Sequence, residues 1–206
     1  MDENSMVYLL DDDRRALESM LDMLRASGYR VEPFNDPKVF VQAVRRDVPS
    51  CLIADYNVGG TTGFDILRKI RFEETSLAAI FVSGCRDVAT AVRAMKRGAT
   101  DFLTKPINPD ALLTAVGAAL DEARGKWRKL QSMSKLNNNY QRLTPREREI
   151  LPLIVSGLLN KQTAYELGRA EITIRIHRGN IMRKMEAQSL PHLVRQAAAL
   201  GIGYAV

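Results

Sequence analysis

Short runs of apolar residues alternate with amphipathic segments through the first 120 residues of the chain. The apolar runs occupy residues 6–10, 29–34, 51–54, 79–82 and 101–103. After each run, apolar residues recur every three or four positions, near residues 17–24, 38–46, 64–73, 88–95 and 113–120. Short runs are typical of buried strands, and the wider spacing is typical of helices that pack by one face. The alternation predicts a doubly wound α/β fold, with a parallel five-stranded sheet and helices on both faces.

The pattern after residue 142 is helical throughout and predicts a small all-α domain. LTPRERE places Thr144 as the N-cap of a first helix, with Pro145 at the first helical position and Glu147 completing a capping box. Asn160 is predicted to cap a second helix, which Gly168 ends, and TIRIHRGNIMRKM forms the third. A fourth helix begins at Ser189. Four short helices with a glycine-containing turn between the second and third predict a helix-turn-helix unit.

The stretch EARGKWRKLQSMSKLNNNYQR connects these two regions and is polar and basic. We expect it to begin as an extension of the preceding helix and then to become a linker. The predicted domains are therefore residues 1–123 and 143–206, with a partly helical linker over residues 124–142.

Charge is divided unevenly along the chain, whose formal net charge is +6. Residues 1–120 carry a net charge of −2, whereas residues 121–142 and residues 143–206 carry +4 each. A basic C-terminal part favours an acidic partner, with nucleic acid as the first candidate. A solvated helical surface explains the same imbalance, so charge alone does not choose between them.

Composition argues against a membrane or secreted protein. Hydrophobic residues make up 46% of the chain, and no apolar stretch approaches the roughly 20 residues needed to span a bilayer. The N-terminal MDENSMVYLL is acidic and lacks a signal-peptide pattern. Cys51 and Cys85 are too few for a disulfide framework. We therefore expect a cytoplasmic protein.

Chemically active side chains occur where the predicted strands end. The first strand stops at Asp11, Asp12 and Asp13, the third stops at Asp55, and the fifth is followed by Lys105. The carboxyl ends of parallel strands meet at one edge of the sheet, where ligands bind. Carboxylates gathered there need a lysine or a hard cation such as Mg²⁺ to offset their repulsion. An aspartate in such a site can be the nucleophile toward a phosphoryl group, so Asp55 is the predicted acceptor.

Each of these residues also has an ordinary explanation. A single aspartate after a strand is usually a turn or cap residue, and a triple aspartate before a helix suits the helix dipole. The combination is far rarer: an acid pair, a single acid, the Ser83 hydroxyl in VSG and the lysine in TKP, each at a separate strand end. We therefore interpret the set as a site.

These motifs resemble those of a known family. LLDDD, LIADYN, VSG and DFLTKP in residues 1–120 are similar to the receiver domain of two-component response regulators. LTPREREIL, GLLNKQTAYELG, TIRIHR and KMEAQSLPHLVRQA in residues 143–203 resemble the LuxR-type effector domain. The combination most resembles the FixJ/NarL class, and it covers nearly the whole chain except the linker.

The resemblance implies a role for each residue of the acidic site. Asp11 and Asp12 would hold Mg²⁺ together with Asp55 and the backbone carbonyl of Asn57, and Asp55 would accept the phosphoryl group. Ser83 would donate a hydrogen bond to one phosphoryl oxygen, and Lys105 would pair with another. Phe102 would be the switch residue, whose ring reorients as the Ser83 hydroxyl moves.

Two positions depart from the family pattern. Val58 and Gly59, followed by Gly60, replace the usual Met-Pro after the acceptor, and the two glycines are expected to loosen this loop. Cys85 and Arg86 replace a frequent His-Gly pair. A bystander thiol is the expected role of Cys85, with redox sensing as the alternative.

The third C-terminal helix is the predicted DNA-reading element. Ile174, His177 and Ile181 share a face that would pack on the domain. Toward the major groove we expect Thr173, Arg175, Ile176 and Gly179. Arg175 would bind guanine, Ile176 a thymine methyl group and Thr173 a phosphate. Further phosphate contacts are expected from Lys161, Arg178 and Arg183.

Together these features predict a transcription regulator with sheet order 2-1-3-4-5. The expected partners are a histidine kinase, double-stranded operator DNA, RNA polymerase and, after phosphorylation, a second copy of the chain.

One alternative is an aspartate-nucleophile phosphatase, but that class places its nucleophile after the first strand within a glycine-rich surround, which LLDDDRR lacks. Another is a regulator of the same fold that does not depend on phosphorylation; Lys105 and the acid pair disfavour it, while Gly59 and Gly60 leave it open.

Overall fold

The structure, a computed structural model, describes residues 5–45, 47–70, 72, 75–84 and 88–203 of the chain. Its strands and helices group into two units, Met1–Lys129 and Leu130–Val206. Cys85 and Arg86, for which a bystander thiol or redox sensing was predicted, lie outside the described residues.

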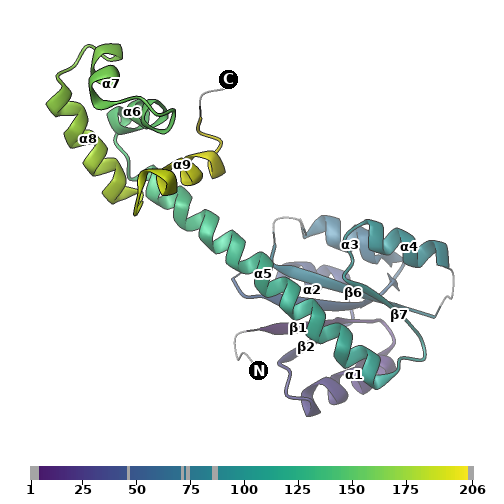
Figure 1. Cartoon of the computed structure of the whole chain (residues 1–206). Coiled ribbons are helices and arrows are strands. Elements are labelled where there is room, and N and C mark those ends of the chain that lie inside the picture. Colours follow the sequence, from purple (N-terminus) through teal and green to yellow (C-terminus); the bar gives the residue numbers. More distant parts are fainter. Residues whose placement is uncertain (1–4, 46, 71, 73–74, 85–87, 204–206) are drawn as a thin grey trace. The chain divides into compact units, whose positions relative to one another are not determined.

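Among the described residues, a parallel sheet of five strands forms the centre of the first unit (Figure 1). The strands are β1 (Met6–Leu10), β2 (Val31–Phe34), β3 (Ser50–Asp55), β6 (Leu77–Ser83) and β7 (Asp101–Thr104). Their order is β2-β1-β3-β6-β7, and neighbouring strands are parallel. This order is the predicted 2-1-3-4-5 order and confirms the doubly wound fold.

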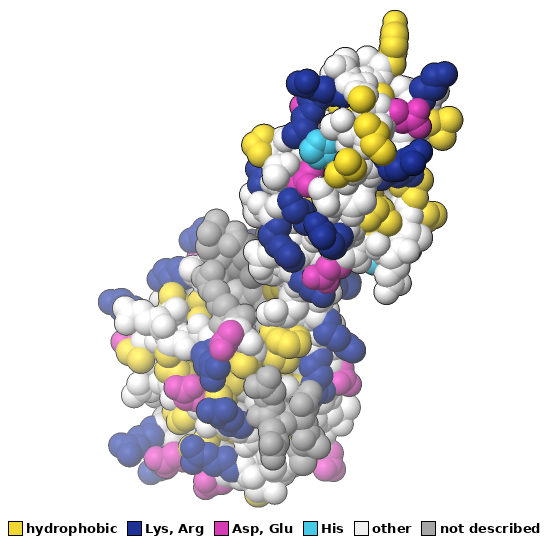
Figure 2. All heavy atoms as spheres, turned by 90° about the vertical axis from the view of Figure 1, so that its left-hand side faces the viewer, with side chains coloured by type: hydrophobic (Ala, Val, Ile, Leu, Met, Phe, Trp, Pro, Cys, Tyr) yellow, Lys and Arg dark blue, Asp and Glu magenta, His cyan; other side chains and the backbone are white. Residues whose placement is uncertain are grey.

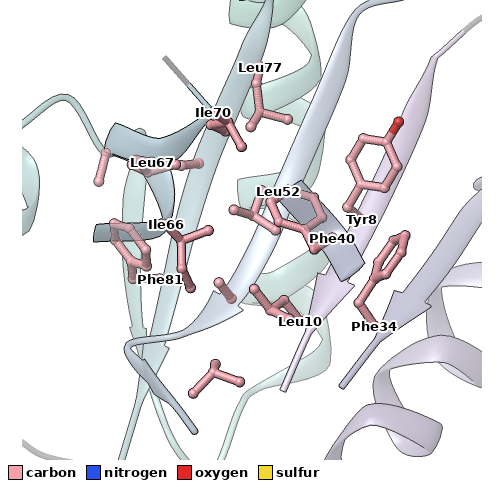
Figure 3. Close-up of a cluster of buried hydrophobic side chains, with 14 of the residues drawn as sticks. Tyr8, Leu10, Phe34, Phe40, Leu52, Ile66, Leu67, Ile70, Leu77 and Phe81 are labelled. Carbon is pink, nitrogen blue, oxygen red and sulfur yellow. The ribbon is translucent and has the colours of Figure 1, made fainter. Parts of the chain in front are cut away.

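Helices cover both faces of this sheet, as the alternating pattern predicts. They are α1 (Arg14–Ala26), α2 (Pro37–Ala43), α3 (Gly63–Lys69), α4 (Val88–Lys96) and α5 (Pro109–Gln141). Successive residues of β1 point to opposite faces, so Tyr8 and Leu10 enter one core and Val7 and Leu9 enter the other. The first core contains Phe34 and Phe40 beside Tyr8, and α2, α3 and α4 contribute to it (Figure 3). The second core lies under α1 and α5.

The loop after Asp55 forms a small hairpin that the sequence did not predict. Strands β4 (Asn57–Val58) and β5 (Thr61–Thr62) pair in antiparallel fashion. Gly59 and Gly60 join them with φ angles of 55° and 76°. Two positive φ angles are what the tightest hairpin turns require, and glycine adopts them without strain. The two glycines therefore form a defined turn, and the looser loop expected from them stays a prediction.

Helix α5 extends much further than the apolar pattern indicates. It continues through the whole predicted linker to Gln141, whereas only part of residues 124–142 was expected to be helical. The asparagines near its end are poor helix formers, but tertiary contacts hold this turn: Asn139 is buried, and the Arg148 guanidinium lies 5.2 Å from the centre of the Tyr140 ring. Despite its 33 residues, α5 is too polar to cross a membrane, and no other helix in the described residues could do so.

In its described residues, the second unit contains four short helices around one apolar core. They are α6 (Pro145–Val155), α7 (Asn160–Glu166), α8 (Glu171–Lys184) and α9 (Leu190–Ala199). Ile150, Ile174, Ile181 and Leu193 are fully buried in this core, and Leu136 of α5 packs against it. The predicted helical C-terminal domain is confirmed.

The predicted capping box is present, and its glutamate does more than cap. Thr144 Oγ1 accepts from Glu147 N at 3.3 Å, and Glu147 Oε2 accepts from Thr144 N at 2.8 Å. The same Oε2 receives a hydrogen bond from Lys184 Nζ of α8 at 2.6 Å. Glu147 is only 2% exposed, so a buried ion pair ties the start of α6 to the end of α8.

We expect Glu147→Gln to weaken the interaction between residue 147 and Lys184 by about 2 kcal/mol at neutral pH. Burial disfavours the charged form, but the Lys184 and Thr144 bonds outweigh it and lower the pKa of Glu147 below its ordinary 4.5. A lowered folded-state pKa gives stability that is present above 4.5 and is lost as pH falls through the folded value. Amide exchange in α6 and α8 should therefore differ between the two proteins at pH 7 and converge in acid. Glu149→Gln, at a half-exposed partner of Arg146, is the control with little effect.

The second helix of this unit begins differently from the prediction. Asn160 is the first helical residue rather than the cap; Leu159 takes the cap position, and its N–H donates to Gln162 Oε1 at 2.8 Å. Asn160 Oδ1 instead accepts from Arg178 Nη1 at 3.3 Å, which joins α7 to α8. The asparagine fixes the two helices of the helix-turn-helix to each other.

Candidate functional site

Three carboxylates meet at the carboxyl edge of the sheet. Asp11 follows β1, Asp12 comes next in the chain, and Asp55 ends β3, which pairs directly with β1. One oxygen from each carboxylate lies within 4.8 Å of the others. Asp11 is fully buried, Asp55 is partly buried and Asp12 is exposed, so the cluster opens to solvent on one side. Three hard oxygen ligands at this spacing fit a divalent cation such as Mg²⁺.

Lys105 supplies the positive charge inside the cluster. Its Nζ lies 2.8 Å from Asp11 Oδ2 and 3.5 Å from Asp55 Oδ1. Its backbone N–H donates to Ser83 O at 2.8 Å, which places the residue at the end of β6. Burial opposes the ammonium charge, but the bonds to Asp11 and Asp55 outweigh it and raise the pKa of Lys105. The lysine is therefore a permanent cation between the two acids.

The electrostatics of Asp55 differ from those of an ordinary surface aspartate. Burial raises its pKa, and the charge of Asp11 acts in the same direction, while Lys105 opposes both. The pKa of Asp55 is raised overall, so the ionised carboxylate is less stable here than in water. A further cation in the cluster would relieve this cost.

Asp12 and the β4–β5 hairpin lie in contact at the exposed side of the cluster. Asp12 Oδ2 accepts from Gly59 N at 3.0 Å, so the β4–β5 turn is joined to Asp12. Asn57 stands exposed at the start of β4, two residues after Asp55. Asp13 lies outside the cluster: its side chain caps α1 by accepting from Arg15 N and Ala16 N.

Ser83 ends β6, the strand that pairs with β3 beside Asp55, and Phe102 lies on β7, the next strand outward. Asp55 pairs with Val82 in the sheet, so Ser83, which is 7% exposed, lies one residue further toward the edge. Phe102 of β7 is partly buried, and its ring centre lies 6.2 Å from that of Tyr56. The structure thus brings the predicted hydroxyl and the predicted aromatic to the same end of the sheet.

Tyr56 and Gly63 support this end of the sheet, and sequence reasoning missed both. Tyr56 N donates to Val82 O at 2.7 Å, and its ring packs edge-on against Phe64, Phe81 and Phe102. A Cβ on Gly63 would overlap the Phe81 ring. The position of Tyr56 directly after the acceptor was the only sequence signal available.

A second candidate site lies on α7 and α8 of the C-terminal unit. The predicted DNA-contacting residues that are exposed are Lys161, Arg175, Ile176, Gly179 and Arg183. Thr173 and Arg178 are partly buried, and Arg178 is already bonded to Asn160. His177 is also partly buried, as its place between the core isoleucines predicts. Figure 2 shows dark blue Lys and Arg side chains gathered on this face of the upper unit, with yellow hydrophobic ones among them.

Both parts of the chain match known protein families. Residues 7–117 match the family model of the response regulator receiver domain, and residues 141–197 match that of bacterial regulatory proteins of the luxR family. The chain belongs to the response regulators. It is a transcription regulator of the two-component type with a LuxR-type DNA-binding domain.

The relatives of this response regulator extend over nearly its whole length. The response regulator protein TodT of Pseudomonas putida is 41% identical over 194 residues, covering 94% of this chain and 86% of TodT. The transcriptional regulatory protein FixJ of Azorhizobium caulinodans is 36% identical over 98% of this chain and 96% of its own. Among solved structures, the response regulator StyR matches with a TM-score of 0.83 at 33% identity, covering 95% of this chain and 98% of StyR.

Proposed function

We propose that Asp55 of this response regulator accepts a phosphoryl group from a histidine kinase. The observation that carries the proposal is the convergence of Asp55, Asp11, Asp12 and Lys105 at one partly open edge of the sheet. In the transfer, an Asp55 carboxylate oxygen attacks the phosphorus of a phosphohistidine. The phosphorus–nitrogen bond breaks, and the histidine nitrogen leaves with the electron pair and takes up a proton.

The neighbouring residues prepare the site for that transfer. Asp11, Asp12, Asp55 and the backbone carbonyl of Asn57 would hold Mg²⁺, which when bound offsets the negative charge of the phosphoryl oxygens. Lys105 is positioned to exchange part of its contact with Asp11 for a phosphoryl oxygen, because its ammonium already lies 3.5 Å from Asp55. Ser83 would donate its hydroxyl to another phosphoryl oxygen. We also expect the chain to hydrolyse its own aspartyl phosphate slowly, without acting as an enzyme on other substrates.

The signal would leave the pocket through β6, β7 and α4. A hydroxyl drawn toward the phosphoryl group vacates space next to Phe102, whose ring is only partly buried and can fill it. Such a movement shifts a population between two arrangements rather than building a new fold. Helix α4 lies against β7, so it is the surface element nearest to this change.

Helix α4 also carries the surface that we propose for dimerisation. Val88, Val92 and Met95 lie one helical turn apart and are 73%, 46% and 48% exposed. Lys96 and Arg97 border this stripe, but Arg97 is stacked over the Phe64 ring at 4.7 Å. The apolar stripe is therefore the proposed centre of the dimer, since apolar burial drives association.

Val92→Asp is expected to prevent dimerisation after phosphorylation without preventing phosphorylation itself. An unpaired carboxylate in the centre of an apolar contact should weaken the dimer roughly 100-fold, or about 3 kcal/mol. Sedimentation with a small phosphodonor and Mg²⁺ measures this, with Val39→Asp as the matched control because Val39 of α2 is 53% exposed and lies elsewhere. A phosphorylated parent that stays monomeric at micromolar concentration contradicts the dimer proposal.

The effector domain would place α8 in the major groove of operator DNA. A single domain of this size offers one helix to the groove, so a dimer bound to a pseudo-palindromic site doubles the specific contacts. Once bound, the regulator would act on transcription by contacting RNA polymerase. Arg175 is exposed on α8 and can bind guanine through N7 and O6, whereas Lys161 at the start of α7 faces the phosphates.

Arg175→Ala and Lys161→Ala are expected to weaken operator binding in different ways. Loss of Arg175 should cost about 1–3 kcal/mol on the preferred site and relax the preference at one base pair. Loss of Lys161 should weaken binding to all sequences alike and reduce the salt dependence by about one phosphate contact. Titration against a set of single-base operator variants at two salt concentrations separates these patterns. Identical behaviour of the two variants would refute the assignment.

A further inference from the structure

The outermost line of α8 begins with two isoleucines. Ile172 and Ile176 are 57% and 58% exposed, although they lie in the first two turns of a helix whose Ile174 and Ile181 are fully buried. At about 100° per residue, Ile172 and Ile176 point roughly opposite to Ile174 and Ile181. Gly179 and Arg183 continue the same outward line. The two isoleucines are therefore as far from the core of the unit as α8 allows.

Exposed cations share the helix-turn-helix with this apolar pair and outnumber its exposed acids, Glu166 and Glu171. Exposed Lys161, Arg169, Arg175 and Arg183 all belong to α7, the turn after it, or α8. On the face that contains α8, yellow side chains lie directly among dark blue ones (Figure 2). A protein partner matching this surface would need an apolar ridge flanked by acids. Double-stranded DNA has that character, because its phosphates border a groove in which the thymine methyl groups are the apolar points.

Resting on the proposed DNA-binding function, we propose that Ile172 is a second reader of thymine, acting together with Ile176. The two side chains start about 6 Å apart along the helix axis, close to two base-pair steps of about 3.4 Å. Each isoleucine buries a thymine C5 methyl group, so the half-site contains two thymines about two steps apart. The exposed Glu171 precedes Ile172 in the first turn of α8, where its carboxylate suits the positive end of the helix dipole.

Replacing thymine with uracil tests this directly, because uracil lacks only the methyl group. The phosphorylated protein first selects its preferred duplex from a random DNA pool, and each thymine of a half-site is then replaced in turn. We expect two positions at which the replacement weakens binding about fourfold, the factor that corresponds to one buried methyl group. In Ile172→Ala one of these two positions should become insensitive to the replacement, and in Ile176→Ala the other should.

Val194→Ala is the matched control, since Val194 of α9 is also exposed and its loss should leave both sensitive positions unchanged. Circular dichroism checks the fold of each variant, and alanine is a better helix former than isoleucine at an exposed position. The proposal is overturned if no thymine is sensitive, or if the Ile172→Ala protein retains both sensitive positions. A phosphorylated protein that selects no sequence at all would instead overturn the proposed DNA-binding function.

Discussion

Asp55→Asn is expected to abolish formation of the phosphorylated protein. The amide that replaces the carboxylate is a poor nucleophile, and Asp55 is the partly buried acid of the cluster, 3.5 Å from the Lys105 ammonium. Incubation with a small phosphodonor and Mg²⁺, followed by intact-protein mass measurement, should show one phosphoryl adduct on the parent and none on the variant. A chelator added to the parent should have the same effect as the substitution.

Asp22→Asn is the matched control, because Asp22 is an exposed carboxylate of α1. It should accept one phosphoryl group as the parent does. An adduct that persists in Asp55→Asn would place the acceptor elsewhere. Rapid turnover of many equivalents of donor by the parent would favour the phosphatase alternative, and a parent that binds its operator equally well with and without donor would favour the regulator that does not use phosphorylation.

Lys105→Ala is expected to separate phosphorylation from its consequences. The adduct should still form, but the phosphoryl group loses its main positive partner, so dimerisation and operator binding should no longer follow. The substitution also leaves Asp11, whose side chain is 1% exposed, without the ammonium at 2.8 Å, at a cost of about 2–3 kcal/mol in stability.

Mg²⁺ provides a second measurement on the same variant. A cation that binds the acid cluster replaces the missing ammonium charge, so Mg²⁺ should raise the thermal midpoint of Lys105→Ala more than that of the parent. Lys69→Ala, at an exposed lysine of α3, should behave as the parent in every assay. If Lys105→Ala dimerises on phosphorylation as the parent does, the role assigned to Lys105 is wrong.

The acidic cluster could be predicted because it depends on topology alone. Strand ends in a parallel sheet share one edge, so Asp11, Asp55 and Lys105 could be brought together without knowledge of any side-chain contact. The support under the cluster could not be predicted in this way. The fit of Gly63 against Phe81 joins residues from different elements, and nothing in the local pattern of either residue indicates it.

Local capping signals succeeded at α6 and failed at α7, where Leu159 and not Asn160 takes the cap position. The capping box of Thr144 and Glu147 was predicted correctly, but the third partner, Lys184, lies 37 residues away and was not. The sequence predicted that Gly59 and Gly60 loosen the loop, because glycine has a flexible backbone. In the structure both glycines have positive φ angles and form a hairpin turn. Gly59 also donates to Asp12, a contact across 47 residues.

The depth to which α5 enters the C-terminal core determines where this protein can be divided. Leu136 and Tyr140 pack in that core, Asn139 is buried, and Lys135 is paired with Glu186 at 2.7 Å. A gene fragment that starts at Leu143, where the sequence pattern becomes periodic again, would remove these groups and expose the apolar side chains beneath them. One that starts at Leu130 keeps them. Recombination between members of this family should therefore preserve the effector domain only when the joint falls before that last part of the helix.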